Sequence, residues 1–150
     1  MIGHATTLEA PVELLDSDIR LTLPARPENV AVVRHVLGAL SDALALPPTL
    51  TEDIRLAVSE ACTNVVRHAY SDGEGALDVT VRSEGDALEV IVSDSGRGVE
   101  PSPDTSGPGL GLPLIAALTD SVGIERSATA GSRLTMTFRR ARETPALELA

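Results

Sequence analysis

The sequence predicts an α+β fold, a two-layer α/β sandwich in which helices cover one face of an antiparallel or mixed sheet. Segments with apolar residues at period two alternate with segments of helical period, in the order strand, two helices, two strands, loop, helix, two strands. The chain has 150 residues, of which 43% are hydrophobic, and this suits one domain with its own core. Because Tyr70 and Phe138 are the only aromatic residues, aliphatic side chains must form that core.

The N-terminal elements are an arm, a strand and a helix. Residues 1–18 carry four acids without a base and show no sustained period, so we expect a flexible arm. Alternation over residues 19–23 predicts a short strand. Apolar residues then recur at spacings of 3, 4, 3 and 4, which predicts an amphipathic helix that ends before Pro47: Val30, Val33, Leu37, Leu40 and Leu44.

A second helix follows the two prolines at 47 and 48. We expect it to start near Thr49 or Thr51, either of which could cap it, with Glu52 and Asp53 in the first turn. Its apolar stripe consists of Ile54, Val58, Ala61, Val65 and Ala69. Residues 71–75 are rich in Gly, Ser, Asp and Glu and end it.

Two alternating segments, residues 77–81 and 88–92, predict an antiparallel hairpin with its turn at 83–86. Residues 94–111 are rich in Gly, Pro, Ser and Asp, have no period, and predict a long loop of the kind that often carries function. A short helix at 112–121, a strand at 122–126 and a strand at 134–138 follow. We expect one domain over residues 19–139 and a C-terminal tail over 140–150.

The composition is acidic and contains no lysine. The chain has 12 basic residues, all Arg, against 22 acidic residues, for a formal net charge of -10. Chemistry that requires a lysine amine, such as a Schiff base or a phosphate-binding-loop lysine, is therefore excluded. An acidic chain with almost no aromatic residues also lacks the cationic groove and stacking rings of a nucleic-acid surface, so we expect no direct binding to nucleic acid.

We expect a cytoplasmic protein that does not enter the membrane. No apolar run approaches the roughly 18 residues of a transmembrane helix, and no signal peptide is recognisable. The lone Cys62 cannot form an internal disulfide, which agrees with a reducing compartment.

Three segments carry residues suited to chemistry. In the second helix, Glu60, Asn64 and Arg67 share one stripe with His68 at its margin, although a solvated helix face has the same pattern. Residues 94–98, Asp-Ser-Gly-Arg-Gly, follow an apolar strand, and residues 107–112, Gly-Pro-Gly-Leu-Gly-Leu, open onto a helix. An Asp at a strand end can accept a hydrogen bond from the exocyclic amine of a nucleobase. Glycines before a helix can hold phosphate with free backbone N–H groups. Each of these loops alone could also be a turn or a hinge.

Together and in this order, the three segments resemble the N, G1 and G2 boxes of the gyrase, Hsp90, histidine kinase and MutL (GHKL) ATPase superfamily. The N box is similar to residues 58–64 with His68, Ala69 and Tyr70, and its Ser-Glu-Ala-x-Thr-Asn form resembles the anti-sigma-factor serine/threonine kinases. The resemblance runs from about Ile19 to Phe138, and the set of boxes is specific although each box is not.

This resemblance implies a Bergerat-type fold that holds ATP between the N-box helix, the G1 loop and a lid that ends at the G2 box. Asp94 would accept a hydrogen bond from the adenine amine, with Gly96 and Gly98 letting the base lie against backbone. Asn64 would coordinate Mg²⁺, and Glu60 would be the catalytic carboxylate that takes the proton from the attacking hydroxyl.

Further residues are expected around the nucleotide by the same resemblance. Arg67 and Arg97 are the basic side chains nearest the expected phosphates, and Ser132 stands where the family often has Thr beside the adenine pocket. An exposed serine in a turn is the alternative for Ser132. The full expected set of nucleotide-binding residues is Asn64, Arg67, His68, Asp94, Gly96, Arg97, Gly98, Gly107, Gly109, Leu110, Gly111, Leu112 and Ser132.

The resemblance also implies partners. The family's kinases bind Mg·ATP, sequester a sigma factor and phosphorylate a small STAS-type anti-anti-sigma protein, and they usually form homodimers. Arg34 matches an arginine that contacts the partner protein, although an arginine that only flanks the apolar stripe is the commoner case.

One alternative to this kinase remains, and another is not expected. Residues 99–106 form a lid of eight residues with two prolines, shorter than many lids of the family, so a nucleotide-sensing binding module with weak catalysis is the second hypothesis. A sensor histidine kinase is not expected, because 150 residues leave no room for a helix pair with a phosphoacceptor His before the ATPase region.

Overall fold

A computed structural model describes residues 18–71, 74–96, 111–127 and 130–140. The elements in these ranges are β1 (Ile19–Pro24), α2 (Pro27–Ala43), α3 (Pro48–His68), β2 (Ala76–Glu84), β3 (Ala87–Asp94), α4 (Gly111–Leu118), β4 (Ser121–Ser127) and β5 (Gly131–Arg139). Nearly all of the expected arm and tail lies outside the described residues, as does the loop at 97–110.

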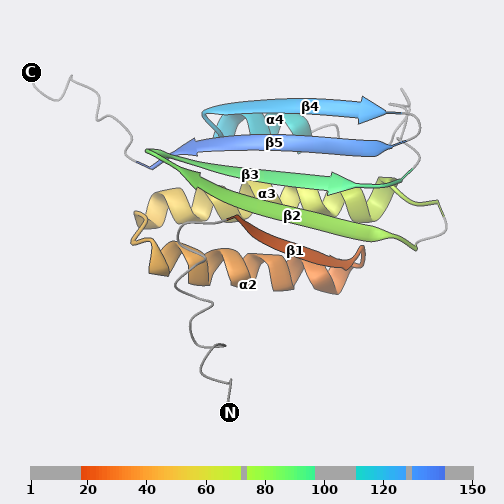
Figure 1. Cartoon of the computed structure of the whole chain (residues 1–150), viewed down its shortest axis with the longest axis horizontal. Coiled ribbons are helices and arrows are strands. Elements are labelled where there is room, and N and C mark those ends of the chain that lie inside the picture. Colours follow the sequence, from red (N-terminus) through yellow and green to blue (C-terminus); the bar gives the residue numbers. More distant parts are fainter. Residues whose placement is uncertain (1–17, 72–73, 97–110, 128–129, 141–150) are drawn as a thin grey trace, which may run out of the picture.

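The five strands form one sheet in the order β1-β2-β3-β5-β4, and every pairing between neighbours in that order is antiparallel. The described helices lie on one face of this sheet (Figure 1). The predicted two-layer α+β fold is thus confirmed, with antiparallel pairing throughout the described strands. None of the described helices is both long and apolar enough to cross a membrane.

The start of α3 differs from the prediction. Pro47 is the N-cap residue and makes no side-chain capping bond, and the helix begins at Pro48. A proline suits the first helical position because its φ is fixed and it has no N–H to leave unpaired. Thr51 therefore lies inside the first turn, where its hydroxyl donates a hydrogen bond to the Pro47 carbonyl at 3.2 Å. Neither predicted cap, Thr49 or Thr51, is the N-cap, and no acidic residue lies in the first turn.

The short helix α4 also differs slightly, since it ends at Leu118 rather than near residue 121. The Asp120 N–H donates to the Thr137 carbonyl at 2.8 Å, which draws the chain into the sheet before β4 begins at Ser121. The hairpin between β2 and β3 turns on two residues, and the first of them, Gly85, has φ +60, which glycine adopts without strain.

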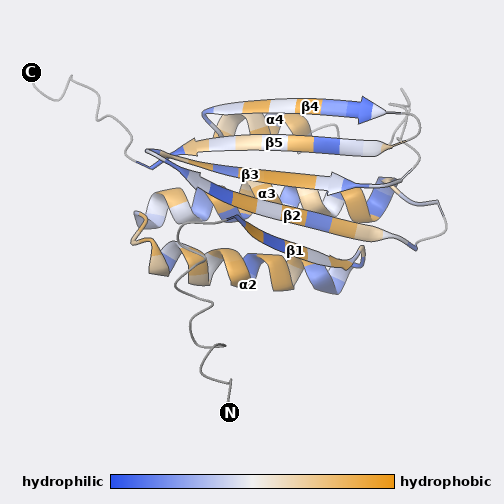
Figure 2. Cartoon of the chain, in the orientation of Figure 1, coloured by the Kyte–Doolittle hydropathy of each residue, from blue (hydrophilic) through white to orange (hydrophobic). Residues whose placement is uncertain are grey.

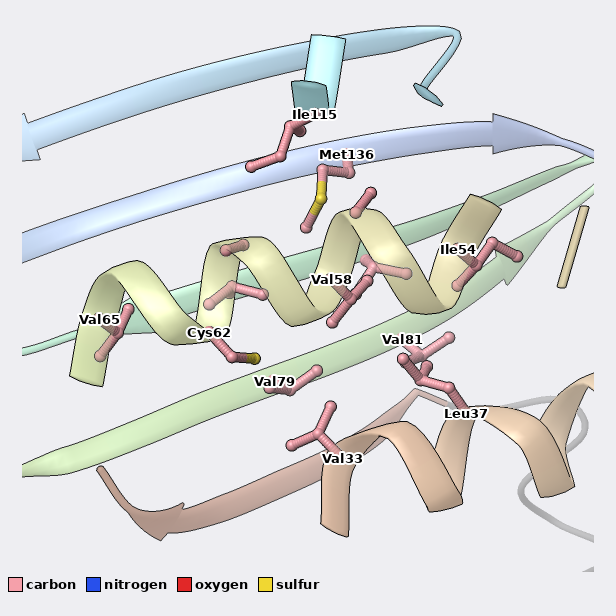
Figure 3. Close-up of a cluster of buried hydrophobic side chains, with 14 of the residues drawn as sticks. Val33, Leu37, Ile54, Val58, Cys62, Val65, Val79, Val81, Ile115 and Met136 are labelled. Carbon is pink, nitrogen blue, oxygen red and sulfur yellow. The ribbon is translucent and has the colours of Figure 1, made fainter. Parts of the chain in front are cut away.

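The apolar stripes predicted for the helices meet the sheet in one core. Figure 3 shows side chains from α2, α3, α4, β2 and β5 in this cluster, and Figure 2 shows apolar segments along α2, α3, β2 and β3. The largest fully buried side chains are Phe138, Leu37, Leu50, Ile54, Leu77, Leu88, Ile115 and Met136. The second-helix stripe is buried as predicted. Because this core holds the apolar side of α3 against the sheet, it determines the direction in which the polar side of α3 faces.

The opposite face of the sheet bears the alternate residues of each strand. One row across it consists of Thr80, Ile91, Thr135 and Gly123. A Cβ added at Gly123 would meet no atom within 4 Å. Next to this row, Arg82 pairs with Asp18 at 2.9 Å and with Glu89 at 3.6 Å. Apart from Ile91 and Gly123, the residues named on this face are polar, and the helices lie on the other side.

Candidate functional site

The side of α3 that faces α4 brings together three residues expected in the site. A Cβ added at Gly111, the first residue of α4, would lie 3.0 Å from Asn64 Nδ2 and 3.2 Å from Glu60 Oε2. It would lie 3.5 Å from Asn64 Oδ1. The N box and the end of the G2 box, far apart in the sequence, therefore meet at one point, and only glycine leaves both side chains undisturbed there.

This donor set fits a magnesium ion shared with a phosphate. Magnesium prefers oxygen ligands, keeps several waters, and is usually held by one or two protein groups plus substrate phosphates. The Asn64 amide oxygen and the Glu60 carboxylate are such oxygens. Within the described ranges no group of three or more His, Cys, Asp or Glu is placed to hold a metal ion.

Asp94 ends β3, as predicted, and its carboxylate is held by two donors. The Gly96 N–H donates to Oδ1 at 2.9 Å, and the Ser132 hydroxyl donates to Oδ2 at 2.6 Å. Ser132 lies directly opposite Asp94 in the register of β3 and β5. Asp94 is only 6% exposed. Because a carboxylate has about four acceptor positions, capacity remains for a further donor such as an exocyclic amine.

Two glycines allow the backbone to close around Asp94. A Cβ at Gly96 would overlap the Ala69 carbonyl oxygen, and a Cβ at Gly131 would overlap the Asp94 carbonyl oxygen. Gly131 also has φ +90. At Gly96 the sequence predicted a close approach of a base to the backbone, and the close neighbour in the structure is the Ala69 carbonyl oxygen. No local pattern indicates the close contact at Gly131, because it depends on the pairing of β3 with β5.

Tyr70 joins residues 95 and 96 to the end of α3, although it was not among the residues expected in the site. Its hydroxyl donates to the Ala76 carbonyl at 2.6 Å and accepts from the Ser95 N–H at 2.9 Å. The signal available in the sequence was its place at the end of the segment that resembles the N box.

The remaining expected residues divide into two groups. Arg67 and His68 are exposed in the last turn of α3, Arg34 is exposed on α2, and Leu112 is 38% exposed on α4. Their roles stay predictions. The others lie outside the described residues: Arg97, Gly98, Gly107, Gly109 and Leu110.

Comparison with known proteins gives a consistent result. Residues 23–138 match the family model described as a histidine kinase-like ATPase domain. The chain is 37% identical over 134 residues to the serine-protein kinase RsbW of Halalkalibacterium halodurans, covering 79% of this chain and 81% of that protein. It is 36% identical over 126 residues to the RsbW of Bacillus velezensis, covering 73% and 79%.

Two solved structures have the same fold. The crystal structure of the RsbU and RsbW domains of a Mycobacterium tuberculosis protein matches with a TM-score of 0.69 at 27% identity. That match covers 85% of this chain, which spans 34% of the other. The SiaB–SiaC complex of Pseudomonas aeruginosa matches with a TM-score of 0.59 at 16% identity, over 92% of this chain and 99% of that one. This second likeness shows the fold alone.

Proposed function

This chain belongs to the histidine kinase-like ATPase domain family, and on that premise we propose that it is an ATP-dependent serine-protein kinase that acts in a partner switch. The observation that carries the proposal is the meeting of Glu60 and Asn64 with Gly111. A carboxylate, an amide oxygen and the start of a helix converge there, and these groups suit the base, the metal ligand and the phosphate-binding N–H groups of a phosphoryl-transfer site. The relatives named serine-protein kinase RsbW, at 32% to 37% identity over most of the chain, support the same activity.

At the adenine end of the proposed pocket, Asp94 accepts a hydrogen bond from the exocyclic amine. The donors at Gly96 and Ser132 support this role, because they hold the carboxylate in one orientation before any ligand arrives. The residues proposed to line the rest of the nucleotide are Arg67, His68, Arg97, Gly98, Gly107, Gly109, Leu110 and Leu112.

At the phosphate end, Asn64 holds Mg²⁺, which neutralises phosphate charge when bound. Glu60 lies one helical turn before it and accepts the proton of the attacking serine hydroxyl. Gly111 and the N–H groups at the start of α4 receive phosphate oxygens. The kinase domain proposed here spans residues 19–139.

The proposed partners are a sigma factor and a STAS-type anti-anti-sigma protein, which compete for the kinase in the cytoplasm. The net charge of -10 favours a partner surface with basic patches. Arg34 is exposed on α2 and is proposed as a partner contact. A homodimer is proposed as the working form.

The test combines two variants that fail at different steps. Glu60→Ala should bind ATP within about twofold of the native protein but lose transfer to STAS-domain proteins of the same genome by about 10²-fold to 10⁴-fold. Asp94→Asn should weaken ATP binding about tenfold or more, because a charged acceptor is lost. It should still fold, since an amide can accept from Gly96 and pair with the Ser132 hydroxyl.

Calorimetry measures ATP binding, and radiolabelled ATP measures transfer. Glu52→Ala is the matched control, because it removes an exposed acid from the same helix. Normal transfer by Glu60→Ala would show that the base lies elsewhere. If the native protein binds ATP but phosphorylates no STAS protein, the nucleotide-sensing module, which the eight-residue lid at 99–106 favours, replaces the kinase.

A further inference from the structure

We propose that Tyr70 is a positioning residue for ATP. Its hydroxyl holds the loop that follows Asp94 against the end of α3, and so fixes the adenine end of the pocket relative to the phosphate end. The inference rests on the proposed function, because it concerns the affinity of the same site. Tyr70 acts through Ser95, whose N–H binds its hydroxyl.

The hydroxyl of Tyr70 acts both as a hydrogen-bond donor and as an acceptor. It donates to the Ala76 carbonyl at the start of β2 at 2.6 Å and accepts from the Ser95 N–H at 2.9 Å. The ring lies directly against the backbone of Gly75, where an added Cβ would overlap it. Tyr70 is partly buried against the core. The phenol thus has one orientation, with its oxygen between a strand and a loop.

Ser95 is the middle residue of the turn that presents Asp94. On one side of it lies the Asp94 carboxylate, and on the other lies Gly96, whose N–H binds that carboxylate. Gly96 also lies against the carbonyl of Ala69, the residue before Tyr70. Two consecutive residues just after α3, 69 and 70, therefore contact two consecutive residues of the loop, 96 and 95.

The same helix carries Glu60 and Asn64 two or three turns earlier. A contact between the end of α3 and the loop therefore sets the spacing between the adenine acceptor and the metal ligand. When that spacing is fixed in the free protein, binding does not have to order the loop. Without the hydroxyl, Ser95 can bond to water because it is exposed, so the loop would gain freedom while the fold persists.

The experiment compares Tyr70→Phe with the native protein and with Thr51→Val. Phenylalanine keeps the ring against Gly75 and removes only the hydroxyl. Thr51→Val is the matched control, because it removes a hydroxyl that donates to a backbone carbonyl at the other end of α3, at 3.2 Å. Thermal unfolding of all three proteins verifies that each is folded.

Three measurements follow. In Tyr70→Phe we expect the Kd and the KM for Mg·ATP to rise about tenfold while kcat at saturating ATP stays within about twofold, the signature of lost uniform binding. Hydrogen exchange at the Ser95 amide, measured without nucleotide, should become at least several-fold faster. In the native protein, ATP should change the near-UV circular dichroism of Tyr70, the only tyrosine in a chain without tryptophan. Thr51→Val should leave the Kd, the KM and Ser95 exchange unchanged.

Each outcome decides the inference. Unchanged ATP affinity in folded Tyr70→Phe overturns it, and so does an equal loss of affinity in Thr51→Val. A fall in kcat with unchanged KM also overturns it, because Tyr70 would then act on transfer and not on binding. If the native protein itself fails to bind Mg·ATP, the proposed function is wrong, and the inference is overturned with it even if exchange at Ser95 responds as expected.

Discussion

At the scale of single residues, Asp94 is the one charged side chain that the described part of the chain buries. Burying a charge is unfavourable unless hydrogen bonds compensate it, and here the Gly96 N–H and the Ser132 hydroxyl do so. A core built for stability alone would use an apolar residue at this strand end. The burial of a carboxylate with spare acceptor capacity therefore supports the binding role proposed for Asp94.

Cys62, in contrast to Asp94, lies among apolar side chains of the core and is 0% exposed. Burial raises the pKa of the Cys62 thiol from 9.0 to about 12. In the unfolded chain the thiol loses its proton near pH 9.0, whereas in the folded chain it stays protonated up to about pH 12. The stability that the neutral thiol contributes is thus complete below pH 9.0 and is lost as pH rises towards 12.

Cys62→Ala should reveal this linkage. Near neutral pH the variant should be less stable than the native protein by about 1 kcal/mol, because a small cavity forms. Near pH 10 the difference should shrink by about 1 kcal/mol, since only the native chain has a thiol that ionises on unfolding. Urea denaturation of both proteins at the two pH values measures the difference. A difference that stays constant would contradict the raised pKa.

At the scale of residues, the sequence predicted Asp94 at a strand end, and it left two alternatives for Ser132, a place beside the adenine pocket or an exposed turn. It could not predict that these two side chains bond at 2.6 Å, because their contact depends on the register of β3 and β5. Tyr70 was missed for a similar reason, since both of its hydrogen bonds go to backbone groups that have no signature in the sequence.

At the scale of elements, α2 ends in a Schellman motif that lacks its usual glycine. The Leu46 N–H donates to the Ser41 carbonyl at 3.0 Å, and the Ala45 N–H donates to the Asp42 carbonyl at 3.1 Å. Ala45 has φ 55, in the left-handed region that favours glycine. Both hydrogen bonds of the motif are present, but the Cβ of Ala45 makes this backbone conformation unfavourable and so lowers the stability of the fold.

Ala45→Gly should therefore stabilise the protein by about 0.5 to 1 kcal/mol, because glycine adopts this backbone conformation without strain. Ala39→Gly is the matched control, since Ala39 is an exposed residue inside α2. There the same change should destabilise by about 1 kcal/mol. Chemical denaturation should give free energies of unfolding that change in opposite directions. The same sign for both variants would rule out strain at Ala45.

The elements themselves were largely predictable, because hydrophobic period is a local property. Both long helices and all five strands were expected near their observed positions. The errors lie at ends where other forces decide. The helix α3 begins at Pro48 and has no threonine cap. The helix α4 ends before residue 121, where its end was expected, because the Asp120 N–H bonds to the neighbouring strand β5. Such boundaries depend on the path of the neighbouring chain, which the period does not encode.

At the scale of the whole molecule, the strand order creates the site. Since β5 lies between β3 and β4, the last residue of β3 faces the start of β5. The helices α3 and α4 lie on the same face of the sheet, which brings Glu60 and Gly111 together. The sequence predicted the layers but not this order, because alternation shows that a segment is a strand without showing which strand pairs with it.

The whole fold should be stabilised by its ligand. Mg·ATP at about one hundred times its Kd should add about 2.7 kcal/mol to the free energy of unfolding, because only the folded chain contains the complete site. For a chain of this length, each kcal/mol corresponds to about 2 to 4 °C in Tm. Thermal unfolding monitored by circular dichroism measures the shift.

Chelating the metal should reduce that shift, since Mg²⁺ offsets the phosphate charge in an acidic protein. Asp94→Asn should lose about half of it or more at the same ATP concentration, because its Kd is expected to be about tenfold higher or more. A shift of equal size in Asp94→Asn would mean that ATP binds away from the end of β3.

Two features suit this protein to labelling with a thiol-reactive dye at a single position: the space around Gly123 is open, and the native Cys62 is buried. Cys62 is the only cysteine and is inaccessible in the folded state, and the chain has no lysine. A cysteine introduced at position 123 would meet no neighbouring atom and would lie on the face of the sheet away from the helices. A maleimide dye would then attach at one place in the folded protein without removal of the native cysteine, leaving the helix side free for partners.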